Sequence, residues 1–253
     1  MSGGLRIAAA IAVAAFFLAL SYRVVAHEAP AQLASLAESG APMSPSTNLQ
    51  TRSGEPFGLS DADVPGPVLA GKWQDAERAI RRDIASTGTC SEERSCSDAQ
   101  NAFLSLVNVA REKSGRVQFA VINRAVNLAI AATSDLSQFG KEDVWSSPIE
   151  TLVTRKGDCE DYAILKIAVL RAAGVSPDDL RLAVVRDPVS NEGHAVAAAR
   201  LDGRWLLLDN RRFALVDAAY SAYRPFFALH LQDDAGQRTV MRIETEPSTP
   251  YLL

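Results

Sequence analysis

Three residues of the sequence, Cys159, His194 and Asp209, are of the types that acyl transfer through a cysteine requires. A thiol attacks the carbonyl, an imidazole takes the thiol proton, and a carboxylate orients the imidazole. Cys159 is expected in the first turn of a helix, where free N–H groups and the helix dipole lower a thiol's pKa. A lone cysteine is also often inert packing, so its position alone does not separate the two roles.

The histidine best placed to serve this thiol is His194, because His27 lies in a proline-rich segment and His230 in an apolar, strand-like run. His194 opens one expected strand and Asp209 closes the next. The dipeptide at 202–203, Asp-Gly, is a hairpin signal between the two strands. Pairing across that turn brings His194 and Asp209 to the same end of the hairpin. Taken alone, Asp209 would be an ordinary residue at the end of a strand.

Three acidic residues, Asp158, Glu160 and Asp161, crowd the candidate nucleophile. Their negative charge raises a thiol's pKa and opposes the effect of the helix start. A bound divalent cation would cancel this charge, and oxygen ligands suit Ca²⁺. Three side chains fall short of the roughly 6–8 oxygens that Ca²⁺ takes, so other groups would have to contribute. The alternative is that the acids only cap the helix.

Apolar periodicity predicts helices first and strands afterwards, which indicates an α+β fold with the helix of Cys159 packed on an antiparallel sheet. Segment 133–148 reads as a loop. The expected helices cover 73–84, 97–114, 116–130 and 158–173, and the expected strands cover 180–185, 194–200, 205–208 and about 213–216.

The N-terminus has the parts of a secretory signal: Arg6, an unbroken apolar run over 7–20, and small residues before a cleavage point at Ala26. An uncleaved anchor is the alternative, because Tyr22 to Val25 could lengthen the run. The expected organisation is a signal peptide (1–26), an extended segment rich in Pro, Ala and Ser (27–70), a folded domain (71–235) and a C-terminal tail (236–253).

Export changes the meaning of the three cysteines. Cys90 and Cys96 flank a short polar loop, and an oxidising compartment favours a disulfide between them. Cys159 is then an unpaired thiol in an exported protein, for which catalysis supplies a reason.

Several segments together resemble the bacterial transglutaminase-like cysteine peptidases, the family of LapG-like periplasmic proteases. They are Gly-Asp-Cys-Glu-Asp-Tyr-Ala at 157–163 with Lys166, Gly-His-Ala-Val at 193–196, and Leu-Asp-Asn at 208–210. The likeness extends over about 57–230 and includes the Cys90/Cys96 pair, the segment 123–127, and Asp143-Val144-Trp145 with Pro148.

The resemblance implies a papain/transglutaminase-like fold, a periplasmic location and a triad of Cys159, His194 and Asp209. It also implies calcium dependence through the acidic residues that flank the nucleophile, Asp158 and Glu160 above all. The implied substrate is an extended linker in a surface or secreted protein such as a biofilm adhesin. The implied regulatory partner is an inner-membrane receptor for cyclic-di-GMP.

Two other functions would use the same residues. A protein transglutaminase would resolve the acyl-enzyme with an amine, and a non-catalytic binding module would hold an exported protein in the same groove. The filled triad disfavours the binding module. The formal net charge of -4 and the lack of a Lys/Arg cluster argue against a nucleic-acid partner. The Cys159 N–H is a natural oxyanion donor; Trp145 is a candidate for the second donor, with core packing as the alternative.

Overall fold

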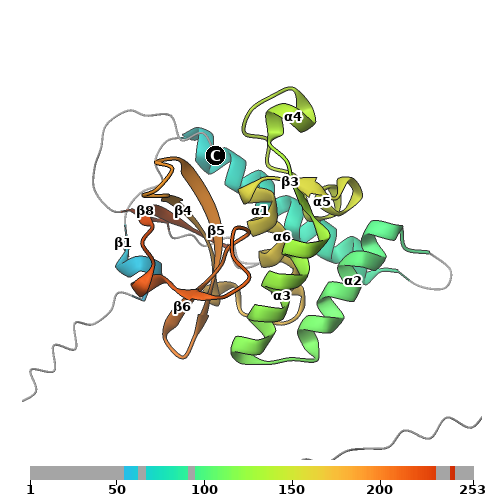
Figure 1. Cartoon of the computed structure of the whole chain (residues 1–253). Helices are drawn as coiled ribbons and strands as arrows, with labels where there is room; N and C mark the ends of the chain where they lie inside the picture. The colour runs from blue at the N-terminus through green and yellow to red at the C-terminus, as the bar shows by residue number, and fades with distance from the viewer. Residues whose placement is uncertain (1–53, 62–66, 91–94, 232–239, 243–253) are drawn as a thin grey trace, which may run out of the picture. The chain divides into compact units, whose positions relative to one another are not determined.

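A seven-stranded antiparallel sheet with helices on one face forms the frame of the protein (Figure 1). The computed structural model describes residues 54–61, 67–90, 95–231 and 240–242. The expected signal peptide, most of the segment 27–70 and most of the tail 236–253 lie outside these residues. Within the described ranges, no helix is both long and apolar enough to cross a membrane.

The helices agree with the sequence where the apolar periodicity is strong. Ser97 caps α2 through a capping box with Gln100, as the Ser-Asp pair predicts. The loop expected over 133–148 is partly wrong, because it contains α4, which Ser134 caps. The helices are α1 (Pro67–Gly88), α2 (Asp98–Arg111), α3 (Gly115–Ala129), α4 (Asp135–Phe139), α5 (Pro148–Thr154) and α6 (Cys159–Ala172), with 3-10 turns η1 (Pro56–Gly58), η2 (Pro177–Asp179) and η3 (Ala218–Tyr220).

The sheet has the order β1-β9-β8-β4-β5-β6-β7, and every neighbouring pair is antiparallel. A separate parallel pair joins β2 to β3. The strands are β1 (Ser60–Asp61), β2 (Ala131–Ala132), β3 (Lys156–Gly157), β4 (Leu180–Arg186), β5 (Gly193–Leu201), β6 (Arg204–Leu208), β7 (Val216–Asp217), β8 (Arg224–His230) and β9 (Val240–Arg242).

The strand expected at 213–216 is mostly wrong, because pairing begins only at Val216. The chain before it leaves the sheet, and side chains on α3 satisfy its carbonyl groups. The Asn123 amide donates to the carbonyl oxygens of Arg212 (2.8 Å) and Phe213 (3.2 Å). Backbone carbonyl groups that leave a sheet need other hydrogen-bond partners, and here the asparagine supplies one in place of a strand.

Helix α6 lies between the sheet and the other helices, and it forms the centre of the core (Figure 1). The sequence predicts a single apolar stripe along it, but its whole circumference is buried, Leu165 and Val169 included. A helix that is apolar on all sides is stable only when it is enclosed. The enclosure also buries Glu160, Asp161 and Lys166 completely.

The opposite face of the sheet carries part of the segment expected to be extended. Leu59 is fully buried against Ala228 of β8. Glu55 accepts two hydrogen bonds from the Arg181 guanidinium, at 2.7 and 2.8 Å. His230, the histidine of β8, lies 3.4 Å from the same carboxylate. These contacts hold residues 54–61 on the sheet.

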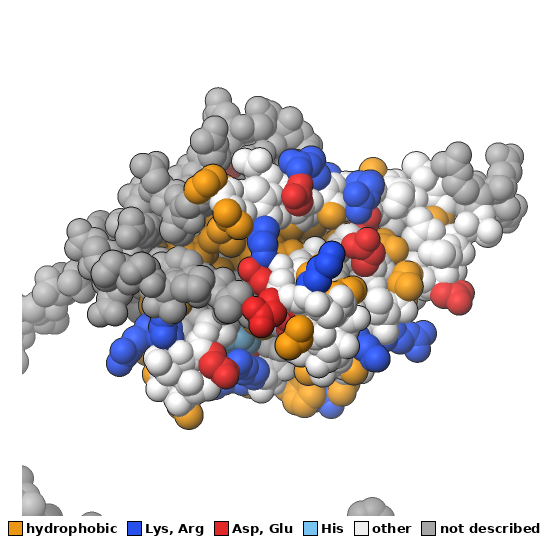
Figure 2. Space-filling view, turned by 90° about the horizontal axis from the view of Figure 1, so that it is seen from above, with side chains coloured by type: hydrophobic (Ala, Val, Ile, Leu, Met, Phe, Trp, Pro, Cys, Tyr) orange, Lys and Arg blue, Asp and Glu red, His pale blue; other side chains and the backbone are white. Residues whose placement is uncertain are grey.

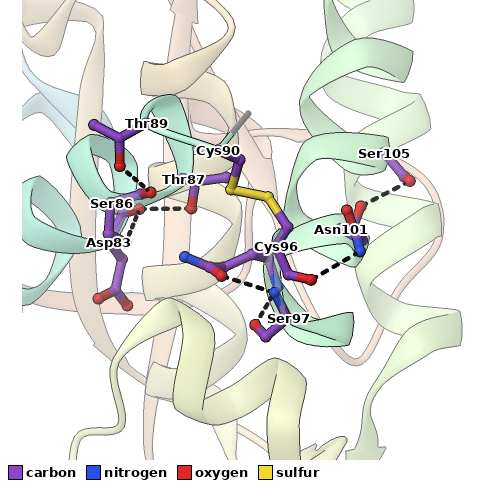
Figure 3. The surroundings of a disulfide bond; sticks show 10 residues. Asp83, Ser86, Thr87, Thr89, Cys90, Cys96, Ser97, Asn101 and Ser105 are labelled. Atoms are coloured by element: carbon purple, nitrogen blue, oxygen red, sulfur yellow. Dashed lines mark hydrogen bonds between the residues drawn. A yellow bond between two sulfur atoms is a disulfide. The ribbon is translucent and has the colours of Figure 1, made fainter. Parts of the chain in front are cut away.

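A disulfide joins Cys90 after α1 to Cys96 before α2, with the two Cα atoms 5.5 Å apart (Figure 3). Less than two turns before Cys90, the buried Asp83 accepts a hydrogen bond of 3.0 Å from the Ile149 N–H at the start of α5. The end of α1 is therefore tied covalently to α2 and by a hydrogen bond to α5.

Acidic and basic side chains are interspersed on the described part of the face in Figure 2. That face has no continuous basic area of the kind that follows a phosphate backbone.

Candidate active site

His194 and Asp209 meet at one end of the β5–β6 hairpin. The turn residues Asp202 and Gly203 both have positive φ, 51° and 74°, as a tight two-residue hairpin requires. From there the strands pair in register as far as Ala197 opposite Leu208. His194 Nε2 lies 2.9 Å from Asp209 Oδ1, and both side chains are buried. The hairpin thus brings together the two residues that the sequence proposed as base and orienting group.

The Asp209 carboxylate is held by several donors. Tyr223 donates its hydroxyl to Oδ2 at 2.7 Å, and the Arg211 N–H donates to Oδ1 at 3.0 Å. Burial alone would raise the pKa of Asp209, but the bonds from His194, Arg211 and Tyr223 outweigh it and hold the pKa at about 2. Asp209 is therefore ionised at neutral pH. The Tyr223 ring also packs against the His194 ring, with the ring centroids 5.5 Å apart. No sequence pattern indicates that Tyr223 belongs to the site.

The backbone that carries Asp209 is fixed from the helical side. The Asn127 amide of α3 donates to the Asp209 carbonyl oxygen at 2.8 Å. Lys166 of α6 donates to the Leu208 carbonyl oxygen at 3.2 Å. Complete burial lowers the pKa of Lys166 to about 7. These two side chains position the end of β6 relative to the helix of the nucleophile.

Cys159 is the first residue of α6 and faces a cleft of about 720 Å³. The cleft is lined by Ala132, Thr133, Ser134, Asp158, Cys159, Glu192, Gly193, Asn210 and Arg211. The backbone N–H of Ala195, the residue that follows His194, lies beside the thiol and acts to lower its pKa. His194 Nδ1 is buried and has no hydrogen-bond partner among the described residues.

The sequence predicts that the helix start lowers the pKa of the Cys159 thiol, but two other effects outweigh it. Burial, followed by the charge of Glu160, raises the pKa of Cys159 well above its ordinary value. The thiol lies 3.3 Å from Glu160 Oε2 and can donate to it. Asp158 occupies the N-cap position as predicted, but its side chain makes no capping hydrogen bond. It belongs to an acidic cluster instead.

This acidic cluster consists of Asp135, Asp158 and Asp161, which each offer a carboxylate oxygen within 4.8 Å of the others. Asp135 Oδ1, Asp158 Oδ1 and Asp161 Oδ2 are buried and lack a hydrogen-bond partner within the described chain. Burial and mutual repulsion raise the pKa of Asp135 to about 6 and that of Asp161 to about 7. Unpaired carboxylate oxygens that converge in this way fit a hard cation such as Ca²⁺.

The cluster differs from the set taken from the sequence. Asp135 belongs to it, although segment 133–148 reads as a loop and gives no sign that Asp135 approaches Cys159. Glu160 lies outside the cluster, between the Cys159 thiol and Asp158, and burial raises its pKa as well. Two backbone N–H groups of the α4–α5 connection, from Val144 and Ser146, bind the carboxylates of Asp135 and Asp161.

Trp145, considered above as an oxyanion donor, donates its indole N–H to Asp143 at 2.9 Å. Its ring packs edge-on against Trp73 of α1, with the ring centroids 6.5 Å apart. The structure therefore favours the packing role for Trp145.

Comparison with known families identifies the family of the chain. Residues 81–245, well over half of the chain, match the family of bacterial transglutaminase-like cysteine proteinases. This chain belongs to that family. The protein is a cysteine peptidase with the α+β fold that the sequence predicts.

Solved structures of LapG from Legionella pneumophila are similar to this peptidase. The EGTA-treated form has a TM-score of 0.50 and 22% identity, and the match covers 66% of this chain and 86% of LapG. The calcium-bound form has a TM-score of 0.49 and 22% identity, with 69% and 93% covered. A third LapG structure has a TM-score of 0.48 and 24% identity, with 60% and 84% covered. Curated protein sequences give no match.

The peptidase depends on Gly157 for the close approach of Asp161 to the backbone before Cys159. A Cβ atom at position 157 would lie 2.6 Å from Asp161 Oδ2 and 2.7 Å from Asp161 Cβ. These distances leave no room for a methyl group unless α6 or the Asp161 side chain moves.

We therefore expect Gly157→Ala to displace Asp161 and the start of α6. Overpacking of this kind costs about 1–3 kcal/mol in the free energy of unfolding, which urea denaturation measures. Gly88→Ala at the end of α1 is the matched control, because its added Cβ would meet no atom within 4 Å. Equal stability of the two variants would show that Gly157 is not needed for this packing.

Proposed function

We propose that this peptidase is an exported endopeptidase in which Cys159, His194 and Asp209 form the catalytic triad. The observation that supports the triad best is the buried bond between His194 Nε2 and Asp209 Oδ1, which leaves Nδ1 without a partner. Cys159 faces the cleft and lies beside the Ala195 N–H. An imidazole with one nitrogen held by a carboxylate and the other unpartnered can serve as the base for this thiol.

In the proposed mechanism, Asp209 accepts the Nε2 proton of His194 in a hydrogen bond and leaves Nδ1 as the base. His194 removes the Cys159 proton, and the sulfur attacks a peptide carbonyl carbon. The backbone N–H of Cys159, at the open start of α6, donates to the developing oxyanion. His194 then protonates the leaving amine, and water activated by the same imidazole hydrolyses the acyl-enzyme.

We further propose that Asp135, Asp158 and Asp161 hold a calcium ion, with Glu160 beside them. A bound ion supplies positive charge that keeps these buried carboxylates ionised. Asp161 and Asp135 then keep accepting from the Ser146 and Val144 N–H groups, which fixes the α4–α5 connection. Family resemblance adds support, since LapG-like peptidases are calcium-dependent.

The substrate and the location are inferred from resemblance and from the N-terminal residues. We propose that the peptidase acts in the periplasm on an extended linker of a surface or secreted protein, such as an adhesin. An inner-membrane receptor for cyclic-di-GMP is the proposed regulator. The signal at 1–26 is the expected route of export.

The triad predicts the behaviour of cells that lack the native enzyme and express either the wild-type chain or a variant of it with the N-terminal residues 1–26 retained. Wild-type protein should release a surface protein, whereas Cys159→Ala should release none. Asp209→Asn should slow release by about 10²- to 10⁴-fold, the range that general acid–base catalysis supplies. Quantitative proteomics of the supernatant gives the measurement, and Asp179→Asn at a surface ion pair is the control. Release by Cys159→Ala at the wild-type rate would refute the proposal.

The acidic cluster predicts that calcium raises stability as well as activity. The pKa values of Asp135 and Asp161, about 6 and 7, exceed the roughly 3.9 of an unfolded aspartate. The folded metal-free protein therefore binds more protons than the unfolded chain between pH 4 and 7, and its stability falls as pH rises through that window.

Added calcium should offset this loss, so the rise in Tm on calcium addition should be larger at pH 8 than at pH 5. A calcium concentration of 100 times Kd adds about 2.7 kcal/mol to the free energy of unfolding. Asp135→Asn should lose most of the calcium-dependent rise, whereas Asp75→Asn, on the exposed face of α1, should keep it. Full activity and an unchanged Tm in EGTA would contradict the calcium proposal.

A further inference from the structure

The connection between α4 and α5 binds the acidic cluster through its backbone. The Val144 N–H donates to the Asp135 carboxylate, and the Ser146 N–H donates to Asp161 Oδ1 at 2.8 Å. Asp135, Ser146 and Asp161 are all buried. Partners that orient the ligands of a metal ion are worth about 10–100-fold in its affinity. A shift of residues 144–146 would therefore disturb two of the three carboxylates of the cluster.

Side chains of the same connection contact α1. The Lys72 ammonium pairs with the Asp143 carboxylate. The Trp145 ring packs edge-on against Trp73, with the ring centroids 6.5 Å apart. Trp73 is buried and donates its indole N–H to the His230 carbonyl oxygen at 2.6 Å, which fixes the orientation of its ring. The connection is therefore in contact with α1 as well as with the cluster.

A third contact from α1 holds the beginning of α5. The buried Asp83 (Figure 3) accepts a hydrogen bond from the Ile149 N–H through Oδ2 at 3.0 Å, and Arg82 Nε lies 3.3 Å from Oδ1. The first N–H groups of a helix have no partner within that helix. Ser147 serves the Glu150 N–H as the N-cap of α5, and Asp83 serves the Ile149 N–H from the neighbouring helix.

Helix α1, all of which the structure describes, contributes no residue to the cluster or to the lining of the cleft. We propose that α1 nevertheless positions the calcium ligands through residues 143–149, with Trp73 and Asp83 as positioning residues. The proposal rests on the proposed calcium site and extends it to a helix that does not touch the ion.

Calcium binding and the packing of α1 then stabilise each other. An ion that holds Asp135 and Asp161 also holds the backbone of residues 144–146, because that backbone donates to both carboxylates. The same segment carries the side chain that packs on Trp73. Coupling between two sites is reciprocal, so loosening the contacts of α1 must lower the affinity for calcium.

Calorimetric titration with calcium chloride measures this coupling in purified protein that has been treated with EGTA and then freed of the chelator. Asp83→Leu removes the acceptor of the Ile149 N–H, and we expect it to raise the Kd for calcium about tenfold, the low end of the effect of partners that orient ligands. Asp83→Asn removes the charge but keeps an acceptor oxygen, so its Kd should stay near the wild-type value. Trp73→Leu removes the ring that packs on Trp145 and should also raise the Kd.

Two further measurements separate positioning from a general loss of stability. Leu182→Val, at a fully buried position of β4, should lower the Tm of the metal-free protein and leave the Kd for calcium unchanged. In the wild type, calcium should slow hydrogen exchange in α1 more than in β8, and this difference should disappear in Asp83→Leu.

An unchanged Kd in both Asp83→Leu and Trp73→Leu would overturn the inference and leave the calcium site itself standing. An equal rise of the Kd in Asp83→Asn and Asp83→Leu would assign the effect to charge instead of position, and an equal rise in Leu182→Val would assign it to stability; either result would also overturn the inference. A wild-type protein that binds no calcium would overturn the proposed calcium site together with this inference.

Discussion

The candidate site depends on one buried contact, the bond between His194 and Asp209. Neither residue is held by its own strand alone. The register of the β5–β6 hairpin places them at one end, and Asn127 and Lys166 fix the backbone of Asp209 from the helical layer. The Tyr223 hydroxyl and the Arg211 N–H donate further hydrogen bonds to the Asp209 carboxylate. With both oxygens engaged, Asp209 stays ionised and the imidazole has a single orientation.

At the start of α6 the pKa shifts have the opposite sign to that of Asp209, because burial raises the pKa values of Glu160 and Asp161. Glu160 and Asp161 are fully buried beside a half-buried thiol, and an isolated buried carboxylate is costly. Protonation relieves the cost in the metal-free protein, which explains the direction of the pKa shifts in the cluster. A cation would relieve it without protonation. Gly157 belongs to the same arrangement, since only a residue without a Cβ lets Asp161 fold back over the backbone.

Local patterns were enough to predict the parts of the site that depend on sequence neighbours. The apolar run after Cys159 predicts α6, and Asp-Gly at 202–203 predicts the hairpin that joins His194 to Asp209. The rest depends on contacts between distant segments. Asp135 reaches the cluster because the α4–α5 connection folds over α6, and Tyr223 reaches Asp209 only after η3 returns the chain to the sheet. The apolar residues near 213–216 resemble a strand in the sequence. In the structure, hydrogen bonds from the distant Asn123 hold this part of the chain in a turn.

The most direct test of the central contact is the tautomer of His194, observed in long-range ¹H–¹⁵N NMR spectra of protein with labelled histidine. The three histidines can be assigned with the variants His27→Gln and His230→Gln. The geometry predicts that Nε2 of His194 carries the proton shared with Asp209, and that this signal shifts in Asp209→Asn. A neutral ring protonated on Nδ1, with a spectrum unaffected by Asp209→Asn, would contradict the account.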